Sequence, residues 1–350
     1  MSRAGVATVL DRLIEFVSIP SVSGAEAALA DRIAEICSES GTAAERAGRN
    51  VWARRGEGPP CLLLNSHLDT VPAAAGWTGD PFSPRLAGDR VIGLGASDAK
   101  ASVASMLEAF LTAPLPERGS VIFCATCDEE TGGEGLEVLA PRLDFDAAVI
   151  GEPNGFLPAV SQKGLLKLKL VARGLAGHAA RPHLSENAIV RAAEDILAIQ
   201  ALRFPAEDPH LGRPTASPTI VRGGERSNVV PDVCEVVVDT RTIAAFDNEA
   251  MLSAIRAAVG SEVTVLSSRL KPVSGDPAWK IAGAASAAAG GAAIGGFPSV
   301  SDLAHVGGRP AVVFGPGEPA QSHAAGESIS VAAVLEAPAV YRRLIAAYFA

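Results

Sequence analysis

The stretch Cys61-Leu62-Leu63-Leu64-Asn65-Ser66-His67-Leu68-Asp69 decides which fold the sequence predicts. Cys61–Asn65 is a short run in which every residue but the last is apolar, which is typical of a strand buried on both faces of a parallel sheet. A helical segment, Ser102–Leu111, separates this run from the next. The further runs of this kind are Val121–Thr126, Ala147–Ile150 and Ala311–Phe314. We therefore predict an α/β fold with a helix-flanked, mostly parallel sheet.

The middle of the chain has a different pattern. Leu165–Ala172 alternates apolar and polar residues, as a half-exposed strand does. Five further segments follow this strand. Together with it they give the order β-α-β-β-α-β, which is that of a ferredoxin-like α+β unit. They cover Asn187–Ala201, Thr219–Val221, Glu235–Thr240, Asn248–Val259 and Val263–Ser267. We expect an inserted domain at 163–272 between two parts of a catalytic domain, at 1–162 and 273–350.

Composition excludes several classes of protein. The 350 residues are 48% hydrophobic and 20% charged, which indicates a folded chain long enough for two domains. The net charge is −9 and no basic stripe is visible, so nucleic acid is not an expected partner. The uncharged stretch Ile281–Ser301 is rich in alanine and glycine and too weakly apolar to cross a membrane. It predicts a packed helix followed by a glycine loop.

The N-terminus and the cysteines indicate a cytoplasmic protein. Met1–Val17 reads as an amphipathic helix rather than a targeting peptide, with Val6 on its apolar face. Ser23-Gly24-Ala25-Glu26 has the spacing of a capping box and predicts the start of a second helix. The five cysteines are odd in number and scattered, which suits a reducing compartment. Cys124 and Cys127 leave a redox alternative open, although residues three apart on a strand face opposite sides.

Residues that can bind metals come just after the four predicted strands. His67 and Asp69 follow the first run, Glu129 and Glu130 the second, Glu152 the third and His323 the fourth. Because ligands bind at the carboxyl ends of strands in open α/β sheets, these side chains are expected to converge. Each has an ordinary alternative: a turn histidine, a solvated acidic turn, or, for Asp98 with Lys100, a surface pair. Together they suit a pair of divalent ions.

These residues belong to a series of motifs that runs along nearly the whole chain. The motifs are His67–Pro72, Gly93–Lys100, Asp128–Gly133, Gly151–Pro153, Gly177–Pro182, Ser227–Pro231, Asp239–Arg241, Ser301–Asp302 and Gly315–Gly317, followed by His323 and Glu327. In this order they resemble the zinc metallopeptidase family of acetylornithine deacetylase, succinyl-diaminopimelate desuccinylase, aminoacylase and glutamate carboxypeptidase. The resemblance implies an enzyme that hydrolyses linear amide bonds with two divalent ions per chain. Zinc is the expected metal, with cobalt or manganese as alternatives.

The same resemblance implies a role for each metal-centre residue. Asp98 would bridge the two ions, His67 and Glu152 would complete one site, and Glu130 and His323 the other. Asp69 would orient the imidazole of His67. Glu129 would be the general base, taking a proton from water and passing it to the leaving amine.

Three residues of the insert complete the expected site. The resemblance implies that the insert is a lid and dimerisation domain and that the chain forms a homodimer. His178 would enter the partner's active site and stabilise the oxyanion, and Arg241 and Asn228 would hold the substrate. A surface-loop histidine and a surface Asp239–Arg241 pair are the alternatives. His183, His210 and His305 match no ligand position and are expected to be structural.

The expected substrate is a small N-acyl amino acid. The motifs near Gln162–Leu165 and His178–Pro182 look most like acetylornithine deacetylases of amino-acid (arginine) biosynthesis, so N-acetyl-L-ornithine is favoured. Succinyl-diaminopimelate, N-acetylcitrulline, an N-acyl-lysine or a peptide of the kind cleaved by dipeptidases and carboxypeptidases are alternatives, and a catalytically silent binding dimer is an alternative of another class. Leu94, Ala101 and Gly326 replace the family's usual Arg, Gly and Asn.

Overall fold

The four apolar runs form the centre of one sheet in a computed structural model, which describes residues 7–132 and 134–350. Every residue in these four strands is buried, and neighbours run parallel. In spatial order they are β6 (Gly119–Thr126), β3 (Cys61–His67), β7 (Ala147–Ile150) and β17 (Ala311–Val313). The predicted mostly parallel sheet is therefore confirmed.

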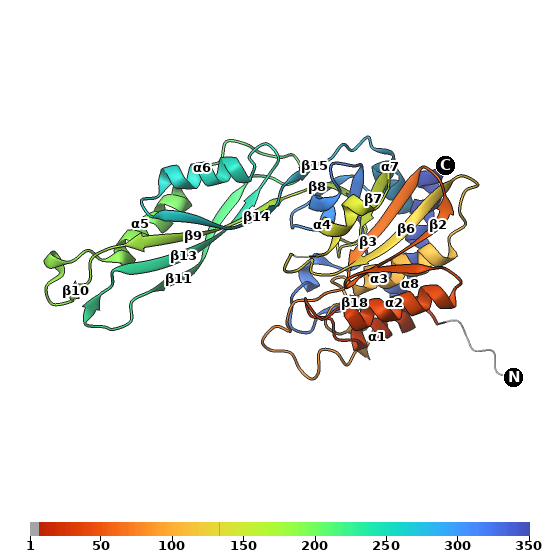
Figure 1. Ribbon diagram of the computed structural model, residues 1–350, viewed down its shortest axis with the longest axis horizontal. Helices are drawn as coiled ribbons and strands as arrows, with labels where there is room; N and C mark the ends of the chain where they lie inside the picture. Colours follow the sequence, from red (N-terminus) through yellow and green to blue (C-terminus); the bar gives the residue numbers. More distant parts are fainter. Residues whose placement is uncertain (1–6, 133) are drawn as a thin grey trace. The chain divides into compact units, whose positions relative to one another are not determined.

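Antiparallel strands extend this sheet on both sides, and helices cover it. β2 (Asn50–Glu57) pairs with β6, β1 (Ala44–Ala47) pairs with β2, and β8 (Ala159–Gln162) pairs with β17. Four helices pack against one another in a layer over the central strands (Figure 1). They are α1 (Val9–Ser18), α3 (Lys100–Thr112), α7 (Lys280–Ala288) and α8 (Val331–Phe349). The unit also contains α4 (Leu136–Leu139) and the small sheet of β4 (Arg85–Ala87), β5 (Arg90–Ile92) and β18 (Ser328–Ser330).

Helix α1 begins later than Met1–Val17 predicts, because Thr8 caps it. The Thr8 hydroxyl accepts a hydrogen bond from the Asp11 amide, and the Asp11 carboxylate accepts one from the Thr8 amide. Val6, predicted on the apolar face, lies outside the described residues.

The capping box predicted at Ser23–Glu26 is wrong. Helix α2 (Ala27–Glu39) begins directly after Glu26 and has no side-chain cap. Ser23 Oγ instead donates to Oδ2 of Asp69 at 2.7 Å, and Glu26 accepts from Arg49 at 2.7 Å. Both side chains are therefore used in contacts with distant loops.

The chain divides into two compact units. The first contains the sheet above and comprises the residues up to Val160 together with Gly275–Gly295 and Ser301–Ala350. The second is Ser161–Ser274 with Gly296–Val300, so it includes the expected insert at 163–272. Gly296–Val300 was expected in the catalytic domain, and the sequence carries no pattern that assigns it to the insert.

The inserted unit has ferredoxin-like topology. Its four long strands are antiparallel in the order β11-β13-β9-β14, which leaves β11 and β14 as edges. The strands are β9 (Gly164–Arg173), β11 (Thr215–Gly223), β13 (Val233–Thr242) and β14 (Glu262–Leu270). The helices α5 (Ala188–Ala201) and α6 (Asn248–Ala258) pack on the sheet. Alternating buried residues of β9, such as Leu166, Leu168 and Leu170, form the core beneath them.

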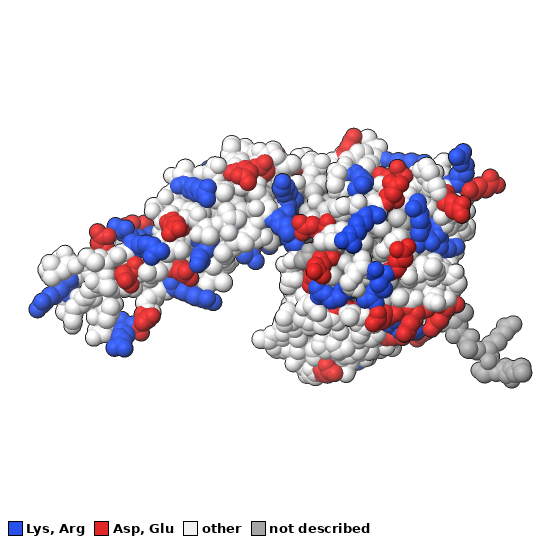
Figure 2. Space-filling view, in the orientation of Figure 1, with Lys and Arg blue, Asp and Glu red and all other residues white. Residues whose placement is uncertain are grey.

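The surface of the described residues carries both charges. Figure 2 shows lysine and arginine side chains interspersed with acidic ones, without a continuous basic stripe on the face drawn. Among the described residues, no helix has the length and apolar character that a membrane span requires.

Candidate metal centre

Asp98 lies between two groups of candidate metal ligands. Its Oδ1 atom is 3.0 Å from Nε2 of His67, and its Oδ2 atom is 3.8 Å from Nε2 of His323. Glu152 belongs to the group around His67, and Glu130 to the group around His323. Within each group, one ligand atom from each residue lies within 4.8 Å of the others. The structure thus brings together all five residues predicted as ligands and places Asp98 in both groups.

The strand ends account for this convergence. His67 is the last residue of β3, and Glu152 comes two residues after β7. Glu130 follows β6, and Nε2 of His323 lies 3.0 Å from both of its carboxylate oxygens. Because the central strands are parallel, their carboxyl ends meet at one edge of the sheet.

The carboxylates at this edge are crowded enough to oppose one another's ionisation. Burial raises the pKa of Glu152 well above its usual value, and the charges of Asp98, Asp302 and Glu130 add to the effect. The pKa of Glu129 is raised in the same way, by burial first and by the charge of Glu152 next. Such a cluster costs free energy unless cations neutralise it. Imidazole nitrogens and carboxylate oxygens suit zinc and similar divalent ions, so the donor set fits two of them.

The turn that carries Glu129 and Glu130 is held by side chains instead of a strand partner. Four consecutive amides, those of residues 127–130, donate to side-chain oxygens. Asn50 accepts from Cys127, Glu26 from Asp128, and Asp69 from both Glu129 and Glu130. Asp128 has φ of 56°, a left-handed conformation that non-glycine residues adopt rarely. The backbone that carries the two glutamates is therefore held by specific hydrogen bonds, unlike that of a solvated acidic turn.

Asp69 contacts both His67 and the acidic turn. Nδ1 of His67 lies 3.0 Å from the backbone carbonyl of Asp69 and 3.6 Å from its nearest carboxylate oxygen. The carboxylate also accepts the amides of Glu129 and Glu130 at 3.1 Å each and the Ser23 hydroxyl at 2.7 Å. Asp69 therefore anchors the acidic turn, and its predicted role of orienting the His67 imidazole stays a prediction.

Glu327 is a supporting residue to which the sequence assigned no role. Its Oε1 accepts the amides of Ser97 and Asp98 at 2.8 and 2.9 Å, and its Oε2 accepts the amide of Gly95 at 2.9 Å. Burial raises the pKa of Glu327 to about 7, and the Asp98 charge adds to the rise. One buried carboxylate thus holds the whole loop that presents the shared ligand.

Lys100 comes directly after the same loop, at the start of α3. Its Nζ is fully buried and donates to the carbonyls of Phe16 and Ile19 at 3.0 Å each. The alternative of a surface pair between Asp98 and Lys100 is therefore wrong, because both residues are buried and Lys100 binds the end of α1.

The inserted unit holds the three residues predicted to contact substrate. His178 lies on β10 (Gly177–His178), which pairs with β12 (Val229–Val230), and Asn228 directly precedes β12. Arg241 lies near the end of β13, where it pairs with Asp239 at 2.8 Å. Within this unit His178 and Asn228 are neighbours, whereas Arg241 is at the opposite end of the sheet.

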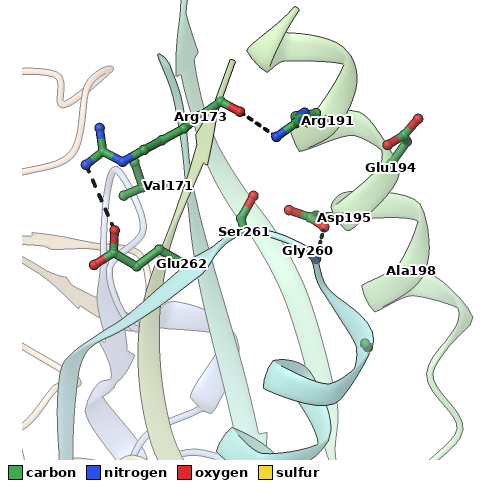
Figure 3. A pocket seen from close by; sticks show the side chains of 10 residues that line it. Val171, Arg173, Arg191, Glu194, Asp195, Ala198, Gly260, Ser261 and Glu262 are labelled. Carbon is green, nitrogen blue, oxygen red and sulfur yellow. Dashed lines mark hydrogen bonds and ion pairs between the residues drawn. The ribbon is translucent and has the colours of Figure 1, made fainter. Parts of the chain in front are cut away.

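The inserted unit also has a hollow of about 620 Å³ between β9, α5 and the start of β14 (Figure 3). Four of its five charged residues, all except Glu194, contact one another or nearby backbone in the described part of the chain. Arg173 lies 3.9 Å from Glu262, Arg191 donates to the Arg173 carbonyl at 2.9 Å, and Asp195 accepts from the Gly260 amide at 2.8 Å. Its lining, within the described residues, contains none of the three predicted substrate contacts.

The three departures from the family pattern are compatible with the local backbone. Gly326, where Asn is usual, has φ of 81°, and Gly and Asn are the residues that adopt this conformation most readily. Ala101 is fully buried in α3, and Leu94 is also buried, so neither offers a side chain to solvent.

The cysteines disfavour the redox alternative. All five are buried and free. Burial raises the pKa of Cys124 well above its usual value and that of Cys127 to about 12. Thiols of this kind are poor nucleophiles.

Residues 63–347 match the model of the peptidase family M20/M25/M40. The chain belongs to this family. It is accordingly an enzyme of a family that hydrolyses amide bonds. A succinyl-diaminopimelate desuccinylase of Xylella fastidiosa is 32% identical over 256 residues, covering 67% of each chain. An acetylornithine deacetylase of Vibrio parahaemolyticus is 32% identical over 225 residues, covering 61% of this chain and 60% of the relative. The aligned part therefore spans about two thirds of these M20 relatives or slightly less.

Solved structures of M20 proteins share the fold over nearly the full chain. A metallo-carboxypeptidase of Sulfolobus solfataricus matches with a TM-score of 0.80 at 19% identity, covering 99% of both chains. A dinuclear metal-binding peptidase of Bacillus subtilis matches with a TM-score of 0.70 at 19% identity, covering 96% of both. The predicted fold class, a catalytic α/β domain with an inserted α+β domain, is thereby confirmed.

Replacing Glu327 by Gln should weaken metal binding. Glutamine has one acceptor oxygen, so the Gly95 amide would face an NH₂ group and the loop carrying Asp98 would shift. We expect metal affinity to fall by about 10–100-fold, the usual effect of losing a residue that supports a ligand. Competition against a chelator measures it, with Glu336→Gln on the exposed face of α8 as the matched control. Unchanged affinity in Glu327→Gln would contradict the anchoring role.

Proposed function

We propose that this M20 enzyme is a two-metal amidohydrolase that removes the acyl group from a small N-acyl amino acid. The observation that carries the proposal is the position of Asp98 between two histidine–glutamate groups, with Glu129 in the adjoining turn. His67, Asp98 and Glu152 would hold one divalent ion, and Asp98, Glu130 and His323 the other. Zinc suits this donor set, and cobalt or manganese are alternatives.

Glu129 is the residue proposed to move protons. Divalent ions bound at such a centre lower the pKa of water and polarise a carbonyl group. The Glu129 carboxylate would accept a proton from the attacking water and donate it to the nitrogen of the leaving amine. Its place directly before the ligand Glu130, in a turn whose amides are bound by Asp69, supports this role.

Two acyl amino acids are the first substrates to consider. The motifs near residues 162–165 and 178–182 favour N-acetyl-L-ornithine, while relatives at 32% identity bear the names of both a deacetylase and a desuccinylase. Succinyl-diaminopimelate therefore stands beside N-acetyl-L-ornithine in the proposal. The guanidinium of Arg241 is suited to bind the substrate carboxylate in both cases.

We further propose that the enzyme is a homodimer whose sites use His178 from the partner chain. Arg241 is opposite Leu165 in the sheet, and β9 continues from there to Arg173, a distance of about 26 Å at the usual strand rise. Strand β9 ends at Arg173, and β10, which carries His178 and pairs with β12, lies beyond the end of β9 (Figure 1). A peptide would need about seven extended residues to cover this span, far more than a single acyl amino acid provides. A small substrate that meets both side chains must therefore meet them from different chains.

The exposed edge of the inserted unit supports dimerisation. Strand β11 is an edge, and its Ile220 and Val221 are 43% and 53% exposed. On α5, which contacts β11, Val190 and Leu197 are 53% and 64% exposed. Exposed apolar side chains beside an unpaired strand edge are suited to pair with a second copy.

A substrate screen tests the reaction. Purified chain loaded with zinc or cobalt should hydrolyse at least one of N-acetyl-L-ornithine, succinyl-diaminopimelate, N-acetylcitrulline and an N-acyl-lysine, with the free amine detected as product. Loss of turnover on chelation and its return with metal are expected. Absence of turnover on all four, with metal bound, would favour a binding protein over the proposed deacylase.

Replacing Glu129 by Gln should abolish turnover without removing metal. Glutamine is nearly the same size but cannot shuttle a proton, so kcat should fall by about 10²–10⁴-fold. Metal content, measured by elemental analysis, should equal that of the wild type. Glu134→Gln, an exposed residue of the same loop, is the control. Near wild-type turnover in Glu129→Gln would exclude it as the base.

Mixing two inactive variants tests whether His178 acts in the partner. Chains with His178→Ala and chains with Glu129→Gln, dissociated and reassociated together, should recover about a quarter of wild-type activity. The reason is that random pairing makes half the dimers mixed, with one working site of two. His183→Ala, which alters an exposed histidine of the same loop, should stay active alone. Recovery no greater than the sum of the parents, with heterodimers demonstrated, would mean that His178 does not act in trans.

A further inference from the structure

Arg49 supports the acidic turn at residues 127–130, which carries Glu129 and Glu130. Arg49 precedes β2 and contacts two buried carboxylates, those of Glu26 and Asp128. Its Nη1 donates to Oε2 of Glu26 at 2.7 Å and to Oδ1 of Asp128 at 3.3 Å, and its Nη2 contacts Oδ2 of Asp128. Because both oxygens of Asp128 are bound, the guanidinium fixes the orientation of this side chain as well as neutralising it.

The two carboxylates would repel each other without Arg49. Glu26 is fully buried and Asp128 is 8% exposed, so little water screens their charges. They are also joined through the backbone, because Oε1 of Glu26 accepts the Asp128 amide at 3.2 Å. Loss of the guanidinium would push the side chains apart and strain that bond.

The conformation of Asp128 is what this support maintains. The residue has φ of 56°, a left-handed conformation that is uncommon for residues other than glycine although Asp adopts it more readily than most, and the contacts of the Asp128 side chain help to hold it. The next two residues are Glu129 and Glu130, whose amides are bound by Asp69. A change of φ at Asp128 would rotate the following peptide and displace the Glu129 carboxylate.

We propose that Arg49 is a positioning residue for Glu129: by pairing with Glu26 and Asp128 it holds the left-handed turn that aims the base. This inference rests on the proposed function of Glu129. Arg49 touches neither the five metal-ligand residues nor Glu129 in the contacts found for the described residues, so it acts through the turn.

The test compares Arg49→Ala with Arg32→Ala. Arg32 is a matched control, because its side chain is 28% exposed against 25% for Arg49 and also pairs with carboxylates, but of α1 and α2 only. Assayed with saturating metal, because the same turn carries the proposed ligand Glu130, Arg49→Ala should lower kcat by about 10²-fold, the scale of small misplacements of a reacting group, with KM unchanged. Arg32→Ala should retain wild-type kcat.

Two measurements distinguish positioning from a loss of stability. Millimolar guanidinium should restore part of the kcat of Arg49→Ala, because the site of Arg49 is partly open to solvent, whereas urea, its neutral analogue, should not. In the double variant Glu26→Gln/Arg49→Met, the buried residue 26 is neutral and needs no charged partner. This variant is used in place of Arg49→Ala if Arg49→Ala does not fold. The double variant has no repulsion from Glu26 but still lacks the guanidinium that binds both oxygens of Asp128, so its kcat should also fall, by no more than that of Arg49→Ala.

A crystal structure of Arg49→Ala, or of the double variant, decides the inference without any assay. Asp128 should leave the left-handed region and the Glu129 carboxylate should move from its wild-type place. An unchanged turn, or an unchanged kcat, would overturn the inference. Inactivity of the wild type on all four amides, or full activity of Glu129→Gln, would count against the proposed function alone, since the structure of the variant still reports the turn.

Discussion

The crowding of buried carboxylates around Asp98 is the constraint on which the rest of the structure depends. Parallel strands bring their carboxyl ends together, and here they bring acidic groups close enough to raise one another's pKa. The arrangement is stable only with positive charge or many hydrogen-bond donors nearby. The protein supplies donors in quantity: three amides on Glu327 and two amides and a hydroxyl on Asp69.

These supports come from parts of the chain outside the four central strands. Ser23 and Glu26 lie just before α2, Arg49 lies before β2, and Glu327 lies just before β18. The helices and edge strands around the central sheet therefore do more than cover its apolar faces. They contribute polar side chains that bind the backbone of two loops, at residues 95–98 and 127–130. These contacts set the positions of the candidate ligands on the two loops.

The strands and four of the five candidate ligands could be predicted from local patterns, whereas Asp98 was assigned from the resemblance of its motif. A continuous apolar run indicates a buried strand, and parallel strands place the residues at their ends together. The supports could not be predicted in this way. The spacing of Ser23 and Glu26 is that of a capping box, yet tertiary contacts use both side chains. The left-handed conformations of Asp128 and His323 likewise depend on neighbours that no spacing in the sequence indicates.

In the proposed homodimer, the length of β9 would make the protein's activity depend on its concentration. One end of the inserted sheet carries Arg241 and the other leads to His178, so an active site that draws on both is complete only in an assembly. Association obeys mass action, and the fraction of complete sites then rises with protein concentration. If the proposed homodimer forms, sites would be mostly incomplete at concentrations below its dissociation constant, and output would increase more steeply than copy number until the chains were paired.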